Sequence, residues 1–117
     1  MARCKPSPLR LRCRSSTCAK SLCAEKREFI LSKQLLRSGT AIGALVREAE
    51  QAESKADFVH KMAIALKEAN ETEYWLELLR ETHYLESDAF SSIHHDVVEL
   101  LKLLTSIINS SKRRISQ

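Results

Sequence analysis

The fold of this chain is decided by one stretch, SKADFVHKMAIALKEANETEYWLELL at residues 54–79. Steps of four and three residues place side chains on one face of an α-helix. Apolar and small residues recur at these steps in the order Phe58, Met62, Ala65, Ala69, Thr72, Leu76 and Leu79. No proline interrupts the stretch, and Ser54 followed by Asp57 resembles a capping box at its start. The pattern predicts a long amphipathic helix over residues 55–85.

The segments on both sides repeat this pattern. Residues 25–52 carry a seam of Leu31, Leu35, Ser38, Ile42, Leu45, Ala49 and Ala52, and residues 88–111 carry Phe90, Ile93, Val97, Leu100, Leu104 and Ile107. The links near Glu53 and Glu86 are short, which forces neighbouring helices to be antiparallel. The chain has only two glycines and two prolines, which argues against a strand-rich fold. We predict an all-α, antiparallel up-and-down four-helix bundle with three long helices and a weak or short first helix.

The weak element is the N-terminal segment. Six of the 19 basic residues and none of the 15 acidic residues lie in residues 1–23, so residues 24–117 carry 13 basic and 15 acidic residues, a net charge of −2. Pro6 and Pro8 disfavour regular structure there, and the apolar residues show no sustained period. We therefore divide the chain into a basic, cysteine-containing segment at 1–23 and a bundle domain at 24–117. Residues 1–15 are predicted to be disordered, with a frayed helix over about 16–24.

All four cysteines, Cys4, Cys13, Cys18 and Cys23, lie in this segment at spacings of 9, 5 and 5. No C-x-x-C pair is present, so the spacing shows no zinc signature. Disulfides among these cysteines would cross-link only the N-terminal segment and not the bundle. We therefore interpret the cysteines as reduced thiols of a cytoplasmic protein. The sequence contains no run of about 18 apolar residues, so it predicts no membrane span.

Metal and catalytic sites receive little support from the pattern. His94 and His95 are adjacent on a helix and point in different directions, so they do not share one site easily with Asp96. Asp57 and His60 have the i, i+3 spacing of half a di-metal site, but no Glu-x-x-His motif completes it. We expect no metal, no cofactor, no small-molecule substrate and no enzymatic activity.

Two pairs of residues are candidates for packing or subunit interfaces. Gly39 and Gly43 clear one helical face so that another backbone can approach, and Tyr74 and Trp75 place two rings on the central helix. Packing is the preferred interpretation for both pairs. The alternatives are a ligand or nucleic-acid backbone on the glycine face and a base-stacking platform at the rings.

Basic residues near the two ends of the chain are the better candidates for nucleic-acid contacts, because they would neutralise phosphates. The candidates are Arg10, Arg12, Arg14, Arg37, Lys112, Arg113 and Arg114.

Three stretches carry a family resemblance. LSKQLLRSGTAIGALVREA at residues 31–49, residues 54–79, and ELLKLLTSIINSSK at residues 99–112 resemble the bacterial four helix bundle proteins, also called 23S ribosomal RNA intervening-sequence proteins. The resemblance covers residues 25–114. It implies a cytoplasmic four-helix bundle that forms homopentamers, in a family with no established enzymatic activity, whose members are in some cases encoded within intervening sequences of ribosomal RNA genes. A related group of retroelement accessory proteins implies nucleic acid and a reverse transcriptase as partners.

The chain departs from the family pattern at two places. Leu45 stands where the family usually has Asn, and residues 1–23 do not resemble the family's amphipathic first helix. This segment either forms a poor first helix or reflects a misassigned start. We expect a non-enzymatic homo-oligomer that binds structured RNA or a nucleic-acid enzyme, with a protein-interaction module that has no nucleic-acid role as the alternative.

Overall fold

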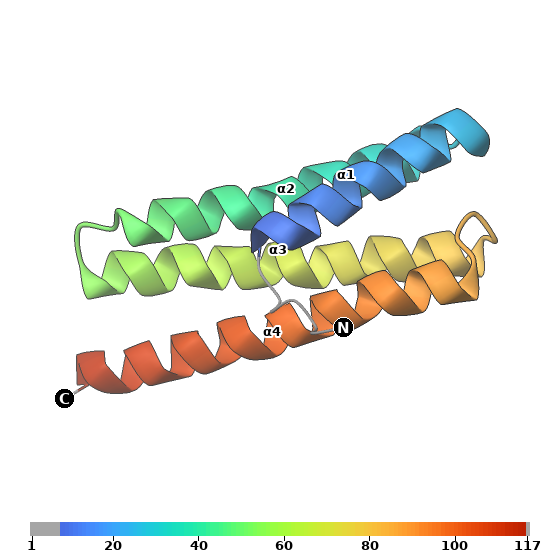
Figure 1. The fold of residues 1–117 in the computed structure, drawn as a ribbon. Coiled ribbons are helices and arrows are strands. Elements are labelled where there is room, and N and C mark those ends of the chain that lie inside the picture. Colours follow the sequence, from blue (N-terminus) through green and yellow to red (C-terminus); the bar gives the residue numbers. More distant parts are fainter. Residues whose placement is uncertain (1–7, 117) are drawn as a thin grey trace.

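The computed structural model describes the backbone of residues 8–116, with the side chains at positions 9, 10, 115 and 116 left undescribed. Four helices fill this range: α1 (Pro8–Glu25), α2 (Ile30–Glu50), α3 (Lys55–Glu81) and α4 (Ser87–Ser116). They run alternately in opposite directions (Figure 1). Each helix packs against its neighbours in sequence, and the first and last helices, α1 and α4, share a smaller contact. The predicted all-α antiparallel four-helix bundle is confirmed.

The core follows the predicted seams most closely in α3. Met62, Ala65, Ala69, Thr72, Leu76 and Leu79 are all buried, and only Phe58 at the start of the seam is half-buried. The seam of α4 is buried from Phe90 to Leu104, but Ile108 replaces Ile107 as its last buried residue. A straight helix drifts by about 20° per heptad against a strict seven-residue repeat, so a long seam moves to the next residue near its end.

The prediction that the N-terminal segment is disordered up to residue 15 is wrong for residues 8–15. The first helix begins at Pro8, not near residue 16, and its 18 residues carry the proposed domain boundary at 23 and 24 within them. Proline is well suited to the first turn of a helix, where its missing N–H has no partner to lose. The rest of the predicted disorder, at residues 1–7, lies outside the described residues.

The helix α1 joins the core through small and sulfur-containing side chains. Its buried face consists of Leu11, Ser15, Cys18, Ala19 and Leu22. Cysteine is among the most frequently buried residue types, and it packs like a small apolar side chain. Leu11 and Leu22 are the large apolar residues among the described side chains of this face.

At the starts of α2 and α3, side-chain oxygens accept hydrogen bonds from backbone N–H groups. Ser54 Oγ accepts a hydrogen bond of 3.0 Å from the Asp57 N–H, as the capping pattern predicts, whereas the Asp57 carboxylate accepts from the Glu53 N–H at 3.4 Å. The helix predicted over residues 25–52 begins only at Ile30, after a turn at residues 26–29. Within this turn, the Glu28 carboxylate accepts a hydrogen bond from the Leu31 N–H at 2.6 Å. This carboxylate satisfies one of the free N–H groups at the start of α2.

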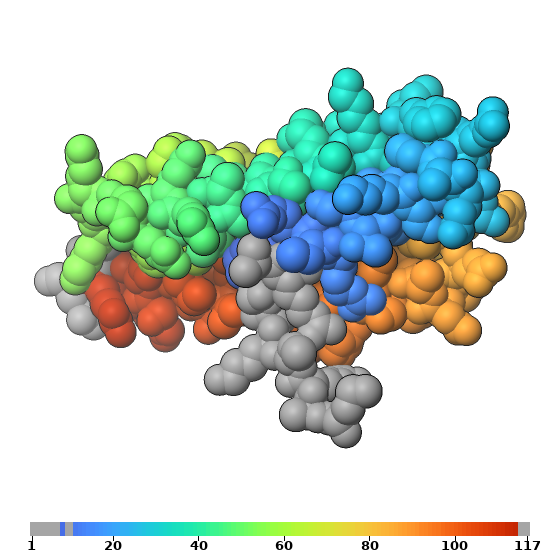
Figure 2. Space-filling model, turned by 45° about the horizontal axis from the view of Figure 1, so that its top comes forward, coloured from blue at the N-terminus to red at the C-terminus, as the bar shows by residue number. Residues whose placement is uncertain are grey.

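The four helices overlap along only part of the molecule. The helix α1 begins midway along α2, so the half of the bundle that contains the α2–α3 turn and the end of α4 consists of three described helices (Figure 1). In the space-filling view the second half of α2 extends well beyond the start of α1 (Figure 2). No helix in the described part of the chain is long and apolar enough to cross a membrane.

Candidate nucleic-acid interface

An open groove lies on α2 next to the start of α1. Its volume is about 1330 Å³, and it is lined by Pro8 and Arg12 of α1 and by residues of α2 that include Arg37, Gly43 and Arg47. A Cβ atom placed on Gly43 would have the Pro8 carbonyl oxygen at 3.9 Å as its nearest neighbour. The α2 backbone is therefore accessible at Gly43, whereas at Gly39 it is covered by Ser15 of α1.

The three arginines of the groove differ in their ion pairs. Arg37 is held by two carboxylates of α3, those of Glu68 and Glu71. The hydrogen bond between Arg37 and Glu71 raises the pKa of the guanidinium and lowers the pKa of the Glu71 carboxyl. Arg12 and Arg47 are exposed and form no ion pair with any residue that the structure describes. Two of the three guanidinium groups are thus available to a phosphate.

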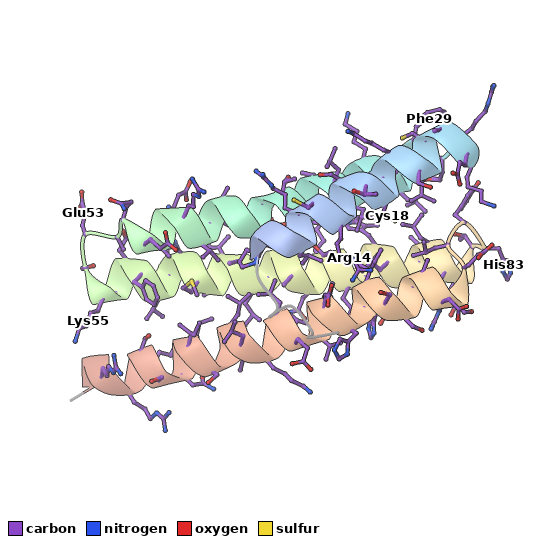
Figure 3. All side chains as sticks on the ribbon, viewed as in Figure 1. Arg14, Cys18, Phe29, Glu53, Lys55 and His83 are labelled. Carbon is purple, nitrogen blue, oxygen red and sulfur yellow. The ribbon has the colours of Figure 1, made fainter. Side chains whose placement is uncertain are left out.

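Arg14 takes a structural position. It points from α1 toward α4 (Figure 3), where its guanidinium pairs with Asp96 and donates to the Ser92 hydroxyl at 2.7 Å and the Ser92 carbonyl at 3.3 Å. The structure thus separates Arg14 from the groove arginines that the sequence grouped with it. The side chain of Arg10 lies outside the described residues.

The other basic candidates lie on the last turns of α4. Lys112, Arg113 and Arg114 are exposed, at the same end of the bundle as the α2–α3 turn (Figure 1). Cations at a helix C-terminus interact favourably with the partial negative charge of its free carbonyl groups. This cluster and the groove, whose lining also includes Glu48 and Glu50, are two places with exposed basic side chains.

The aromatic pair lies between core and surface. The rings of Tyr74 and Trp75 meet edge to face, with centroids 5.0 Å apart. Tyr74 is exposed, whereas Trp75 is half-buried against the core and donates its indole N–H to Glu71 at 3.2 Å. Trp75 thus has partners within its own chain, and Tyr74 is the more accessible ring.

One cluster of polar side chains was predicted only in part: the sequence pointed to His94 but not to the two carboxylates that it meets. Glu73 and Glu77 of α3 meet His94 of α4, with the His94 Nε2 3.0 Å from a Glu73 oxygen. The spacing of Glu73 and Glu77 puts them on one face of α3, but the register of α4 against α3 decides which histidine they meet, and no sequence pattern gives that register. Of the residues grouped with His94 from the sequence, Asp96 instead pairs with Arg14 on α1.

The cysteines of α1 that the structure describes are free thiols. Cys18 is buried, and burial raises the pKa of its thiol, an effect that the nearby Arg14 charge partly offsets. Because the thiolate is the nucleophilic form, this environment makes Cys18 less reactive than an exposed cysteine. The absence of an activating environment distinguishes Cys18 from a catalytic nucleophile.

These features define an antiparallel four-helix bundle protein. The family described as "23S rRNA-intervening sequence protein" matches residues 9–106, and the chain belongs to this family. The match includes residues 9–24, so the expectation that the family resemblance begins only at residue 25 is wrong. The buried face of the first helix combines two leucines with small and thiol-bearing side chains, a mixture that an apolar period does not reveal.

The chain is also similar to a solved structure. This is the crystal structure of a protein of unknown function from the S23 ribosomal protein family of Bacteroides thetaiotaomicron, with 56% sequence identity and a TM-score of 0.85. The similarity covers 86% of this chain and 94% of that one. No curated protein matches the sequence.

Proposed function

We propose that this protein is a non-enzymatic module that binds structured RNA through phosphate contacts in the cytoplasm. The observation that carries the proposal is the groove on α2, where Arg12 and Arg47 lie exposed beside Gly43 and form no ion pair with any residue that the structure describes, although Glu48 and Glu50 also line the groove. Arginine binds phosphate through a planar fork of donors, so two such groups in one groove suit a nucleic-acid backbone. Arg113 and Arg114 on α4 add a second contact surface.

Self-association would make these contacts effective. Residues 24–117 carry a net charge of −2, so a single copy offers only a few phosphate contacts. A homo-oligomer repeats each contact, and weak contacts in one assembly add through their effective concentration. We therefore propose that the RNA-binding form is a homo-oligomer, with five copies as the family resemblance implies.

The test is the salt dependence of binding to a fluorescent RNA hairpin, measured by anisotropy between about 50 and 200 mM salt. We expect the logarithm of affinity to fall linearly with the logarithm of salt concentration. In a double variant with Arg12→Gln and Arg47→Gln, the slope should fall by about 0.9 for each lost phosphate contact. Lys33→Gln is the matched control, because Lys33 is exposed on α2 outside the groove. Salt-independent affinity, or no binding by the assembled protein at low salt, would reject the proposal.

A second candidate is a protein-interaction module whose partner is a protein, such as a nucleic-acid enzyme. The observation in its favour is the pair Phe29 and Ile30 at the α1–α2 turn, whose side chains are 60% and 79% exposed. Adjacent exposed apolar side chains of this size are typical of interaction surfaces. If Phe29→Ser with Ile30→Ser abolishes partner capture in cells and the groove variant does not, this candidate replaces RNA binding.

A further inference from the structure

A cluster of three metal-ligating side chains joins α3 to α4. Oxygens of Glu73 and Glu77 and a ring nitrogen of His94 all lie within 4.8 Å of one another. The His94 Nε2 is 3.0 Å from Glu73 Oε2 and 4.0 Å from Glu77 Oε1. Three ligand atoms bound tetrahedrally to one zinc ion at about 2.0–2.2 Å lie about 3.4 Å apart, between the two distances from Nε2, so the longer separations would have to shorten on binding.

The helices hold these groups in place. Glu73 and Glu77 are one turn apart on α3 and therefore share a face. The His94 ring stacks on the buried Phe90 ring, one turn earlier on α4, with centroids 4.8 Å apart and an angle of 20° between the planes. This stacking orients the imidazole so that Nε2 faces the two carboxylates. A ligand ring fixed by its neighbours loses little freedom when it binds a metal.

The charges of the cluster are not balanced by the rest of the described chain. Two carboxylates one turn apart repel each other. No lysine or arginine that the structure describes forms an ion pair with Glu73 or Glu77. The nearest arginine along α3, Arg80, instead pairs with Glu81 and lies over the Phe90 ring at 4.3 Å from its centroid. A bound cation would remove this repulsion.

We propose that Glu73, Glu77 and His94 form a binding site for a divalent transition-metal ion of the zinc type. The mixed set of one imidazole and two carboxylates selects this class, because Mg²⁺ and Ca²⁺ prefer oxygen ligands alone. The side chains of Glu73, His94 and Glu77 are 27%, 29% and 50% exposed, so the remaining coordination positions are open to water. The ion would link the middle of α3 to the first half of α4.

The experiment is calorimetric titration of the untagged, chelator-treated full chain with ZnCl₂, together with NMR spectra of the imidazole nitrogens. We expect a shift of the His94 Nε2 resonance on metal binding. Because loss of even an outer-shell partner typically costs about 10–100-fold in metal affinity, Glu73→Gln and His94→Gln should each weaken binding at least tenfold. His60→Gln is the matched control, since His60 is an exposed histidine on α3 outside the cluster.

The thiols of the chain offer zinc an alternative site, and the same experiment separates the two. Binding that persists in His94→Gln with unchanged affinity would assign the metal to other groups, such as the cysteines, and overturn the proposal. An unshifted His94 resonance at saturating zinc would also overturn it. Circular dichroism of the glutamine variants verifies that each remains helical, so that lost affinity is not a result of unfolding.

Discussion

A Cβ atom placed on Gly39 of α2 would lie 2.6 Å from the hydroxyl oxygen of Ser15 and 2.8 Å from its Cβ on α1. Both distances are shorter than packed carbon and oxygen atoms tolerate, so the glycine sets how closely the two backbones approach. Gly43, one turn later on the same helix, has no neighbour closer than 3.9 Å at the corresponding position. The two glycines thus have different roles.

This difference predicts opposite effects of the same substitution. Gly43→Ala should stabilise the protein by up to about 1 kcal/mol, because alanine favours the helix and its Cβ would lie in ordinary contact with Pro8, without a clash. Gly39→Ala gains the same helix propensity but must push α1 away, and overpacking of this kind typically costs about 1–3 kcal/mol. Urea unfolding of both variants measures the difference. Equal stabilities would show that α1 yields without cost at Gly39.

The ion pair between Arg14 and Asp96 predicts a coupling between α1 and α4. The pair is partly buried, with side-chain exposures of 27% and 13%, so we expect a coupling of about 1 kcal/mol, at the upper end for such pairs. A double-mutant cycle with Arg14→Gln and Asp96→Asn isolates this coupling from the other contacts of each residue. Additive effects of the two substitutions would mean that the pair does not help to hold α1.

The pair of Arg37 and Glu71 predicts a loss of stability in acid. The pKa of Glu71 is lower in the folded chain than in the unfolded chain, so its contribution is complete above the unfolded value of about 4.3 and disappears as the pH falls through the folded value. Both side chains are more than one-third exposed, which limits the effect to less than about 1 kcal/mol. The stability difference between the natural chain and Arg37→Gln should therefore shrink toward zero below pH 4.3 in urea titrations. Lys33→Gln serves as the control, with a difference that does not follow this pH range.

Burial predicts the order in which the thiols react. Cys18 is 9% exposed and has a raised pKa, whereas Cys13 is exposed. Iodoacetamide should modify Cys13 before Cys18 in the native protein, as peptide mapping by mass spectrometry would show. In urea the two rates should become similar. Equal rates in the native state would indicate that Cys18 is accessible to the reagent for most of the time, and so that α1 is not stably packed on the core.

How far the sequence predicts this fold depends on which residue types form each seam. In α3, large apolar residues and alanines repeat regularly, and the predicted buried positions from Met62 to Leu79 are correct. In α1, the buried face uses Ser15 and Cys18, which an apolar pattern does not count. Ser15 even buries a hydroxyl with no hydrogen-bond partner in the described part of the chain. The first helix therefore depends on its fit against Gly39 more than on its own periodicity.

The candidate sites were less predictable, because they depend on contacts between helices. The sequence identified Arg12 and Arg37 of the groove but not Arg47, whose place beside them follows only from the packing. The separation of Arg14 from the groove and the pairing of Arg37 with α3 also depend on contacts between helices. The meeting of Glu73, Glu77 and His94 depends in the same way on the register of α4 against α3. Neither relationship has a signature within a single helix.

The thin contact between α1 and α4 also bears on how the chain folds. Among the described residues, every larger helix interface joins helices that are consecutive in sequence, across turns of only a few residues, and only the α1–α4 contact joins helices that are not consecutive. Proteins dominated by local contacts fold rapidly, because little loop entropy is lost before contacts form. We expect α2, α3 and α4 to assemble early and α1 to dock late. If α1 docks onto α2 of another copy instead, the same contacts form between chains, which makes helix exchange a natural route to dimers of this bundle.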